Sequence, residues 1–506
     1  MNESSIALRR SLSQPNRSSH LTKLVFWITL LAIFAMAARI SVDSDTWWHL
    51  RAGSWVVEHH AVLQTDLFSY TRWGEPWQYP GWLVEAPMYL IYRAFGPGGL
   101  NVWTALMVAA SFASIWQALS GGPFLRAFAL IFGATASAVY WAARPYLVTF
   151  LFSALFLWIL EDVRWRTSKK STNRLYALPV LMVLWANSHG GFAVGFLLWG
   201  VYFTSLLVRS ALAFLSDKRL PDLRELRRML LVGILLAVAV CINPAGPGLL
   251  AYPFQTVNMG ALKDFIQEWQ SPDFHALSVQ PFLWLLLATI AVIGASEKRL
   301  ALTDFLLLAG FTYLSLLARR NIALFSLVAP IILTRHADGL LSGLPQLSRT
   351  NFGSSVSKRF QGVMNVAILG ILGLGVVAKL SLVFPLSINS SYFKDTFPVD
   401  AVAYLQHEQP GGRLFNSYNW GGFLIWHLPE YPVFIDGRTD LYDGDVMEQW
   451  VQVMRAQEGW QAILDRYDAH IILIEKDAPL VKALENSLQW RRTYRDPLAV
   501  VYQRDG

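Results

Sequence analysis

Two carboxylates, Asp43 and Asp45, lie two residues apart in a polar, aromatic stretch that directly follows the first long apolar run of the chain. An ionised carboxylate can act as a general base and take a proton from a hydroxyl group. The same pair, together with Glu268, could instead hold a divalent cation such as Mg²⁺ or Mn²⁺ through oxygen ligands. A structural role is the third interpretation, because Asp45 precedes an expected helix at 46–59 and Asp is favoured at a helix N-cap. The residues alone leave these alternatives open.

The chain that must position this pair has the composition of a membrane protein. It has 506 residues, of which 54% are hydrophobic and 15% are charged, and its mean hydropathy is +0.36. Soluble domains carry about 25% charged residues. The net charge of +7 does not indicate nucleic acid, because the basic residues cluster in short loops between apolar runs. We therefore expect a lipid bilayer, and no nucleic acid, as a partner.

Apolar runs of about 20 residues can cross the hydrocarbon core as helices, and we expect eleven such spans. The segment 80–95 is also apolar, and we interpret it as a membrane-surface or re-entrant helix outside this count. The chain has a single cysteine, Cys241, so an intrachain disulfide and a thiolate metal cluster are excluded. Cys241 lies inside an apolar run. The expected spans cover residues 24–41, 99–119, 124–142, 146–162, 176–188, 191–209, 228–242, 281–296, 301–318, 320–335 and 363–385.

Basic residues predict which side of the membrane each loop faces, because Lys and Arg in short loops tend to stay cytoplasmic. With eleven spans, the basic stretches at 164–174, 218–228, 298–299 and 349–359 fall on the same side as the N-terminal tail. We therefore expect a multi-pass protein of a plasma (inner) membrane, with a cytoplasmic N-terminus and an extracytoplasmic C-terminal region.

The opposite, outer side then gathers the unusual polar residues. Ionisable groups at the edge of a bilayer are costly and usually mark a site where something is bound or reacted. Arg side chains in outer loops also oppose the sidedness rule, and their planar forks of donors match phosphate oxygens. Snorkelling to ordinary lipid headgroups is the alternative for the Arg319-Arg320 pair. The candidate substrate-binding residues are His49, Arg51, Arg144, His189, Glu268, Arg319 and Arg320, beside the candidate catalytic Asp43 and Asp45.

The histidines of the outer loops do not predict a zinc site. His49, His59, His60 and His189 show no His-x-x-x-His spacing with a nearby carboxylate on one helix. We expect His49 to be a hydrogen-bonding partner in a cavity, and metal ligands stay unknown.

These residues resemble the GT-C superfamily of membrane glycosyltransferases, which take sugars from polyprenyl-phosphate or polyprenyl-pyrophosphate carriers. The stretch 43–51, with His59 and residues 66–71, looks like the acidic first outer loop of such enzymes. The likeness is closer to uncharacterised bacterial members, through Ala143-Arg144-Pro145, residues 185–191, Asn243-Pro244 and Asn419-Trp420-Gly421-Gly422. The resemblance implies Asp43 or Asp45 as the catalytic carboxylate and does not choose between them. The Trp-Trp-Asp motif of oligosaccharyltransferases is absent from the C-terminal part, so glycosylation of Asn sequons is not supported.

The pattern changes near residue 390 to short helices and strands, which predicts a small α/β domain. No glycine-rich phosphate loop is present, so nucleotide binding is not indicated. The run from Phe434 to Asp440 follows an expected strand, where Asp436 and Arg438 would contact an acceptor, cap the cavity or brace the turn as a salt bridge. We expect helices at 399–406, 421–427, 460–467 and 478–488, and strands at 412–416, 432–436, 470–475 and 500–503.

The fold class that we expect is mainly α: a polytopic transmembrane bundle with a small extracytoplasmic α/β domain. Its parts are a cytoplasmic tail at 1–23, a transmembrane domain at 24–388 with an outer loop at 42–98, and the α/β domain at 389–506. The predicted function is transfer of a sugar from a polyprenyl-phosphate donor to an acceptor hydroxyl of a saccharide, lipid or protein on the outer face. The alternative is a non-catalytic lipid-linked saccharide transporter, flippase or polysaccharide-assembly scaffold. A transporter favours polar residues near mid-membrane, whereas here they gather at the outer ends.

Overall fold

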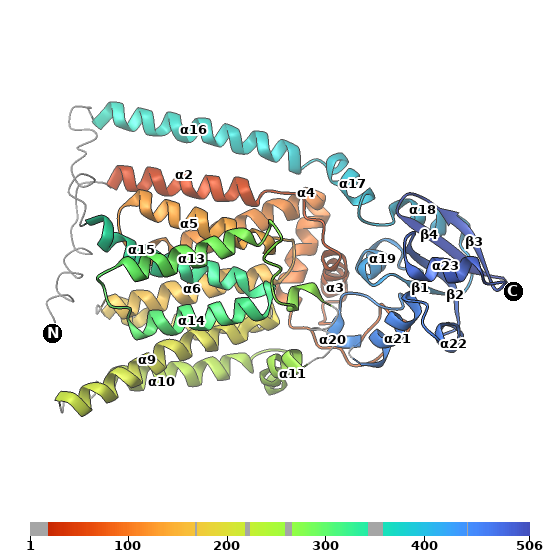
Figure 1. Cartoon of the computed structure of the whole chain (residues 1–506), viewed down its shortest axis with the longest axis horizontal. Helices are drawn as coiled ribbons and strands as arrows, with labels where there is room; N and C mark the ends of the chain where they lie inside the picture. Colours follow the sequence, from red (N-terminus) through yellow and green to blue (C-terminus); the bar gives the residue numbers. More distant parts are fainter. Residues whose placement is uncertain are drawn as a thin grey trace.

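The computed structural model describes residues 19–166, 169–217, 223–258, 266–342, 358–442 and 444–505. Most of the expected N-terminal tail, residues 1–18, and the basic segment 343–357 lie outside the described residues. Long helices form an elongated bundle, and the C-terminal domain lies at one end of it (Figure 1). The helices of the bundle are α2 (Ser19–Ala37), α4 (Trp82–Ile115), α5 (Pro123–Ser137), α6 (Tyr146–Trp165), α8 (Ala177–Ala186), α9 (Ala193–Asp217), α10 (Leu223–Val240), α13 (Gln280–Ala295), α14 (Leu302–Leu317), α15 (Ile322–Ser342) and α16 (Lys358–Val383).

These helices confirm the predicted fold class, because each expected span falls on one of them. Among the described residues, seven helices are long and apolar enough to cross a membrane, and α13 and α14 are shorter apolar helices. Most of the segment 80–95 forms the first part of α4, which consists of two helices that meet at a kink, so it is helical and separate from the span that follows it. Gly96 makes the kink with φ 62°, a backbone conformation that glycine adopts readily, and Pro97 follows it.

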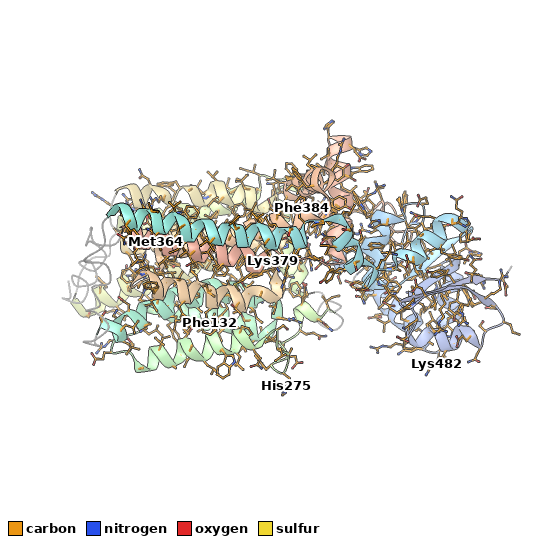
Figure 2. All side chains as sticks on the ribbon, turned by 90° about the horizontal axis from the view of Figure 1, so that it is seen from above. Phe132, His275, Met364, Lys379, Phe384 and Lys482 are labelled. Carbon is orange, nitrogen blue, oxygen red and sulfur yellow. The ribbon has the colours of Figure 1, made fainter. Side chains whose placement is uncertain are left out.

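The bundle has a buried centre and an apolar outer surface. In α15, 72% of the apolar window is buried, whereas the corresponding figure for α16 is 6%. Figure 2 shows α16, with Met364 and Lys379, running along the outside of the bundle. Large exposed apolar side chains on a helix of this length suit contact with lipid tails, in which the backbone polar groups must be satisfied within the helix.

A buried ionic network joins three helices at the end of the bundle far from the C-terminal domain. Arg335 of α15 contacts Glu161 of α6 at 2.7 Å and Asp304 of α14 at 2.5 Å. Arg164 contacts the same two carboxylates, and the Tyr202 hydroxyl donates to Glu161 at 2.5 Å. Each charge has opposite-charge partners, which is the condition under which buried ions are tolerated.

We predict that Arg335→Leu destabilises the protein by about 3–5 kcal/mol, because it leaves two buried carboxylates with one fewer cation. The unfolding midpoint of the purified protein in detergent measures the loss. Exposed Lys394, which pairs with exposed Asp400, provides the control, and Lys394→Leu should change stability by less than about 1 kcal/mol. An Arg335→Leu midpoint equal to that of the control would contradict the prediction.

The C-terminal domain is built on a mixed four-stranded sheet with the order β1-β2-β4-β3. Strand β1 (Arg413–Asn416) pairs in parallel with β2 (Ala469–Glu475), and β4 (Ala499–Arg504) pairs antiparallel with β2 and with β3 (Trp490–Arg495). The sequence did not predict β3. The helices are α17 (Leu386–Lys394), α18 (Val399–Glu408), α19 (Gly421–His427), α20 (Thr439–Tyr442), α21 (Asp445–Met454), α22 (Trp460–Arg466) and α23 (Pro479–Glu485).

The strand expected at 432–436 is wrong. This segment stays out of the sheet and makes a single bridge, between Val433 and Ser69. Side chains replace the missing ladder, because Asn416 accepts from the backbone N–H of Phe434 and Thr71 donates to the Phe434 carbonyl. A segment between the sheet and the outer loop is therefore bound to both.

One hydrophobic core unites the outer loop with the C-terminal domain. Helix α3 (Asp45–His59) lies at the junction (Figure 1). Its buried Trp47 packs edge-on against Phe393 and Phe423 at ring-centroid distances of 5.2 and 5.4 Å. Offset and edge-on aromatic pairs add about 0.5–1.5 kcal/mol beyond their buried area. The start of α3, which holds the acidic pair, is therefore fixed by the domain that it contacts.

Candidate functional site

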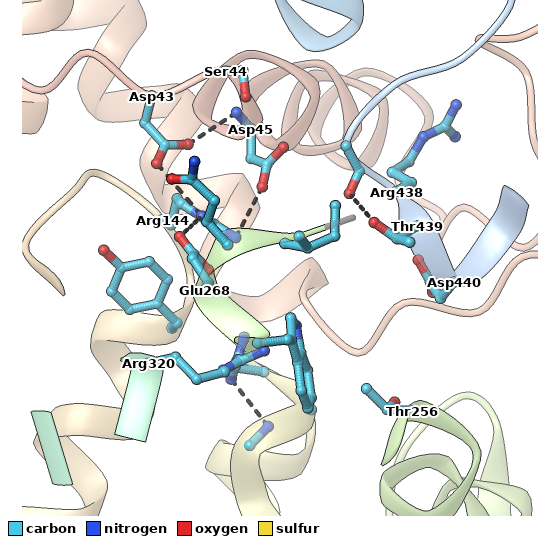
Figure 3. A pocket seen from close by; sticks show the side chains of 18 of the residues that line it. Asp43, Ser44, Asp45, Arg144, Thr256, Glu268, Arg320, Arg438, Thr439 and Asp440 are labelled. Atoms are coloured by element: carbon cyan, nitrogen blue, oxygen red, sulfur yellow. Dashed lines mark hydrogen bonds and ion pairs between the residues drawn. The ribbon is translucent and has the colours of Figure 1, made fainter. Parts of the chain in front are cut away.

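A cavity of about 1000 Å³ opens where the bundle meets the C-terminal domain. Three separate parts of the chain line it: the outer loop with the start of α3, the near ends of the bundle helices, and the C-terminal domain. Figure 3 shows polar side chains from all three parts around it. Of the predicted site residues, the cavity brings together Asp43, Asp45, His49, Arg144, His189, Glu268 and Arg320.

Arg144 is the ionic centre of the cavity wall. Its guanidinium contacts Asp45 at 2.8 Å, Glu268 at 2.9 Å and Asp43 at 3.5 Å. Arg144 lies in the turn just before α6, and the Thr46 hydroxyl donates to the carbonyl of the preceding Ala143 at 3.0 Å. The turn is therefore bonded to the same helix start that holds the acidic pair.

The two aspartates have different surroundings. Asp43 accepts a hydrogen bond from the backbone N–H of Asp45 at 2.9 Å, so Asp43 holds the turn that starts α3. Asp45 makes no such capping bond, and its side chain is 14% exposed at the cavity wall. Burial raises the pKa of Asp45 to about 7, although Arg144 acts in the opposite direction. A pKa of about 7 suits Asp45 to the role of a proton acceptor near neutral pH.

Glu268 and Arg320 come from two neighbouring short turns, η5 (Gln267–Trp269) and η6 (Arg319–Asn321). Burial opposes ionisation of Glu268, but Arg144 and Arg320 outweigh it, so the pKa of Glu268 lies below its ordinary value. The Arg320 guanidinium lies 4.4 Å from the Trp269 ring centroid, which holds it at the wall. Arg320 is thus a cation within the cavity that no carboxylate neutralises at contact distance among the described residues.

Arg319 and Arg51 do not join the cavity. Arg319 donates to the Ser278 hydroxyl at 3.3 Å instead, and neither residue is part of the cavity lining. Arg319 and Arg320 are adjacent in the sequence but have different surroundings in the structure, and sequence spacing could not distinguish them.

Two histidines at the cavity are held by buried partners. His49 Nδ1 lies 2.7 Å from Glu85, and His189 Nδ1 lies 2.8 Å from Thr149. Burial lowers the pKa of both imidazoles well below the ordinary value, so both are neutral near pH 7. Glu85 was not predicted as a site residue from the sequence. The sequence feature that could have identified Glu85 is that it is the one acidic residue in the apolar segment 80–95.

The carboxylates of the cavity do not form a ready metal site. Within the described part of the chain, no group of three or more His, Cys, Asp or Glu side chains is arranged to hold a metal ion. The Arg144 guanidinium lies among Asp43, Asp45 and Glu268. A divalent cation bound by all three would have to displace it, so these residues do not fit the cation that the sequence left open.

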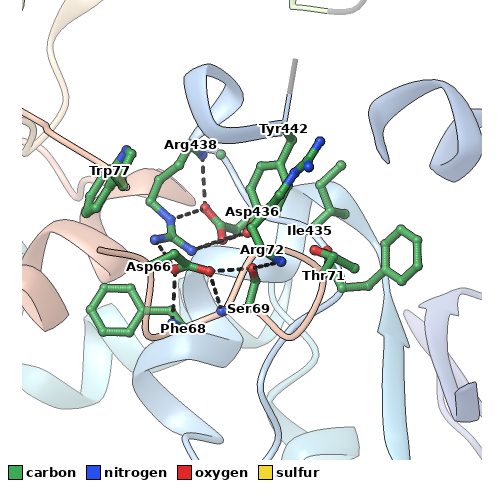
Figure 4. A network of polar contacts seen from close by, with 12 residues as sticks. Asp66, Phe68, Ser69, Thr71, Arg72, Trp77, Ile435, Asp436, Arg438 and Tyr442 are labelled. Carbon is green, nitrogen blue, oxygen red and sulfur yellow. Dashed lines mark hydrogen bonds and ion pairs between the residues drawn. The ribbon is translucent and has the colours of Figure 1, made fainter. Parts of the chain in front are cut away.

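The C-terminal domain forms one wall of the cavity. From this domain, the sequence indicated only Asp436 and Arg438 as residues that would cap the cavity or contact an acceptor. Arg438 is fully buried and contacts Asp66 at 2.6 Å and Asp436 at 2.7 Å. Figure 4 shows this network joining the outer loop to the C-terminal domain, with the Tyr442 hydroxyl donating to Asp436. The Asp436–Arg438 salt bridge, one of the alternatives that the sequence left open, is present, and Arg438 also lines the cavity together with Thr439 and Asp440.

No family model and no curated protein sequence matches this chain. Several solved structures match it. The oligosaccharyltransferase AglB from Archaeoglobus fulgidus, in complex with an inhibitory peptide and a dolichol-phosphate, matches with a TM-score of 0.56 and 9% identity, over 89% of this chain and 69% of that one. An A. fulgidus oligosaccharyltransferase tethered to an acceptor peptide matches at 0.57 and 11% identity, over 97% and 74%.

The arabinofuranosyltransferase AftD from Mycobacteria matches with a TM-score of 0.51 and 16% identity, over 97% of this chain. The chain spans 40% of the length of AftD. At these identities the likeness concerns the fold. The chain therefore has the GT-C fold and is a multi-pass membrane protein. Within that fold, its cavity combines a cluster of carboxylates around one arginine with a second, separate arginine.

We predict that Arg144→Met destabilises the protein more at pH 8 than at pH 5. Without Arg144, burial raises the pKa of Glu268 and raises that of Asp45 further. A carboxyl group whose pKa is higher in the folded state stabilises the fold at a pH below its unfolded-state pKa. This stabilisation is lost as the pH rises through the folded-state pKa. Unfolding midpoints at both pH values test this, and an equal loss at the two would contradict it.

Proposed function

We propose that the protein is an integral membrane glycosyltransferase that moves a sugar from a polyprenyl-phosphate carrier to an acceptor hydroxyl. The cavity is the observation that supports this most directly, because it combines an acceptor of protons, Asp45, with a cation suited to phosphate, Arg320. The reaction would take place on the outer face of a plasma membrane, with the C-terminal domain extracytoplasmic and the N-terminus cytoplasmic. The basic stretches of the loops support this orientation.

The donor would lie with its phosphate at Arg320. A guanidinium offers a planar set of donors that matches phosphate oxygens, and the aromatic contact with Trp269 keeps it in place. Arg144 is less suited to this role, because three carboxylates already contact it. Apolar side chains of α9, α14 and α15, namely Leu197, Leu314 and Leu324, line the same cavity and suit a polyprenyl chain.

Asp45 would be the general base. The acceptor hydroxyl gives its proton to the Asp45 carboxylate while its oxygen bonds to the anomeric carbon of the donor sugar. The bond between that carbon and the phosphate oxygen breaks, and the electron pair leaves with the phosphate, where Arg320 stabilises the negative charge. Asp43 would hold the turn and, with Glu268, would fix Arg144 beside the base. No step in this scheme uses a metal ion.

We predict that Asp45→Asn abolishes sugar transfer, whereas Asp43→Asn reduces it and keeps measurable activity. An amide cannot accept the proton, and general-base catalysis contributes about 10²–10⁴-fold. In wild-type protein, transfer should rise as the pH increases through about 7, because the ionised form of Asp45 is the base. Radiolabelled donors and purified protein in lipid provide the measurement. Activity of Asp45→Asn close to wild type, with both variants folded, would refute the assignment.

We also predict that Arg320→Gln raises the KM for the donor by about tenfold or more, because a charge-assisted hydrogen bond contributes about 1.5–3 kcal/mol. The adjacent Arg319→Gln is a matched control, since Arg319 lies outside the cavity lining. Equal effects of the two substitutions would indicate general attraction to lipid headgroups and would contradict a specific phosphate site.

A further inference from the structure

A turn of the C-terminal domain lies directly against the acidic pair. A methyl group on Gly437 would lie 1.8 Å from the Asp45 Oδ1 atom, which is far inside contact distance. A second glycine of the domain approaches the same segment, because a methyl group on Gly422 would lie 2.2 Å from the carbonyl oxygen of Ser44. At Gly422 the clash would be with backbone, and at Gly437 the Asp45 carboxylate would have to shift, so the backbone of the domain lies against Asp45.

Buried ions hold this turn in place on both sides. The Arg438 guanidinium, next to Gly437, donates two hydrogen bonds to the Asp436 carboxylate, from Nε at 2.8 Å and from Nη2 at 2.7 Å. Its Nη1 donates to Asp66 of the outer loop at 2.6 Å, and all three charged side chains are fully buried (Figure 4). Charge-assisted bonds of this kind are the strong ones. The turn cannot move away from the outer loop without breaking the bond between Arg438 and Asp66.

The outer loop adds bonds that are independent of these charges. The backbone N–H of Val433 donates to the Phe68 carbonyl at 3.0 Å, and the N–H of Tyr70 donates to the Val433 carbonyl at 3.1 Å. The Thr71 hydroxyl donates to the Phe434 carbonyl at 2.6 Å. The segment that leads into the turn is therefore bonded to the loop that also contains Asp45.

Asp45 lies between two constraints, as Figure 3 shows for its neighbours Arg144, Arg438 and Thr439. Arg144 attracts the carboxylate at 2.8 Å, and the Gly437 backbone limits how far it can move on the side of the C-terminal domain. The other charged or titratable groups that act on it are Asp43, Glu268 and Tyr418.

We propose that Gly437 is a positioning residue that sets where the Asp45 carboxylate lies, so that the catalytic site is complete only while the C-terminal domain is docked on the 43–45 segment. This inference rests on the proposed role of Asp45 as the base. It makes the C-terminal domain a component of the active site. Misplacing a reacting group by about 1 Å can cost on the order of 100-fold in rate.

Gly437→Ala tests this proposal, with Gly411→Ala as the matched control. Gly411 belongs to the same domain and has open space where a methyl group would lie. Two readouts are compared in full-length protein in lipid. The first is sugar transfer from a polyprenyl-phosphate donor. The second needs no substrate: labelling of Asp45 by dicyclohexylcarbodiimide, which modifies protonated carboxyl groups, measured by peptide mass spectrometry across pH 5–9.

The expected result is a loss of transfer on the order of 100-fold in Gly437→Ala and a shift of its labelling midpoint to lower pH. A displaced carboxylate moves towards Arg144 or the open cavity, and both favour its ionised form. Gly411→Ala should match wild type in both readouts. Transfer and labelling of Gly437→Ala equal to wild type would overturn the proposal.

Absence of transfer by the wild-type protein, with the labelling shift still present, would reject the proposed function and leave the positioning role standing. Because Gly437→Ala could fail to fold, Thr71→Val is the second variant. It adds no bulk at Asp45 and removes one bond that holds the turn. It should shift the labelling midpoint in the same direction by a smaller amount, and an unchanged midpoint in this folded variant would count against the proposal.

Discussion

The site depends on the sharing of one guanidinium, that of Arg144, among three carboxylates. Glu268 is more than 200 residues away in the sequence from Asp43 and Asp45, and at close range the three carboxylates would repel one another without a cation between them. Because Arg144, Asp43 and Asp45 are taken largely out of water, the arrangement persists only if each of them keeps its geometry. The turn before α6, the start of α3 and η5 are therefore positioned as one unit, and the cavity forms around them.

The rest of the molecule supports that unit from two directions. The ionic network of Glu161, Asp304 and Arg335 joins the helices at the far end of the bundle. At the near end, Arg438 with Asp66 and Asp436 joins the outer loop to the C-terminal domain. Between these networks the bundle is apolar, with side chains of α16 and other helices exposed where lipid would contact them. The cavity and its polar lining thereby lie at the end of the bundle that meets the C-terminal domain.

The sequence predicted much of this fold and part of the site. Apolar runs located the helices, because crossing a bilayer demands length and hydrophobicity that few other structures need. Asp45, Arg144, Glu268 and Arg320 were identifiable as charges in expected outer loops. Glu85 and the approach of Gly437 to Asp45 were not, because they depend on packing between distant segments. The segment 432–436 has the pattern of a strand, and only its partners in the folded chain decide that it lies outside the sheet.

Donor turnover tests the central claim most directly. Purified wild-type protein in lipid would be incubated with a panel of radiolabelled polyprenyl-phosphate sugars and candidate acceptors, with Mg²⁺ or Mn²⁺ and with a chelator. The account predicts release of label from one donor, and predicts that the chelator leaves the rate unchanged, because Arg144 already lies among the three carboxylates. Absence of release from every donor, with the protein folded, would contradict the account and favour a binding or transport role.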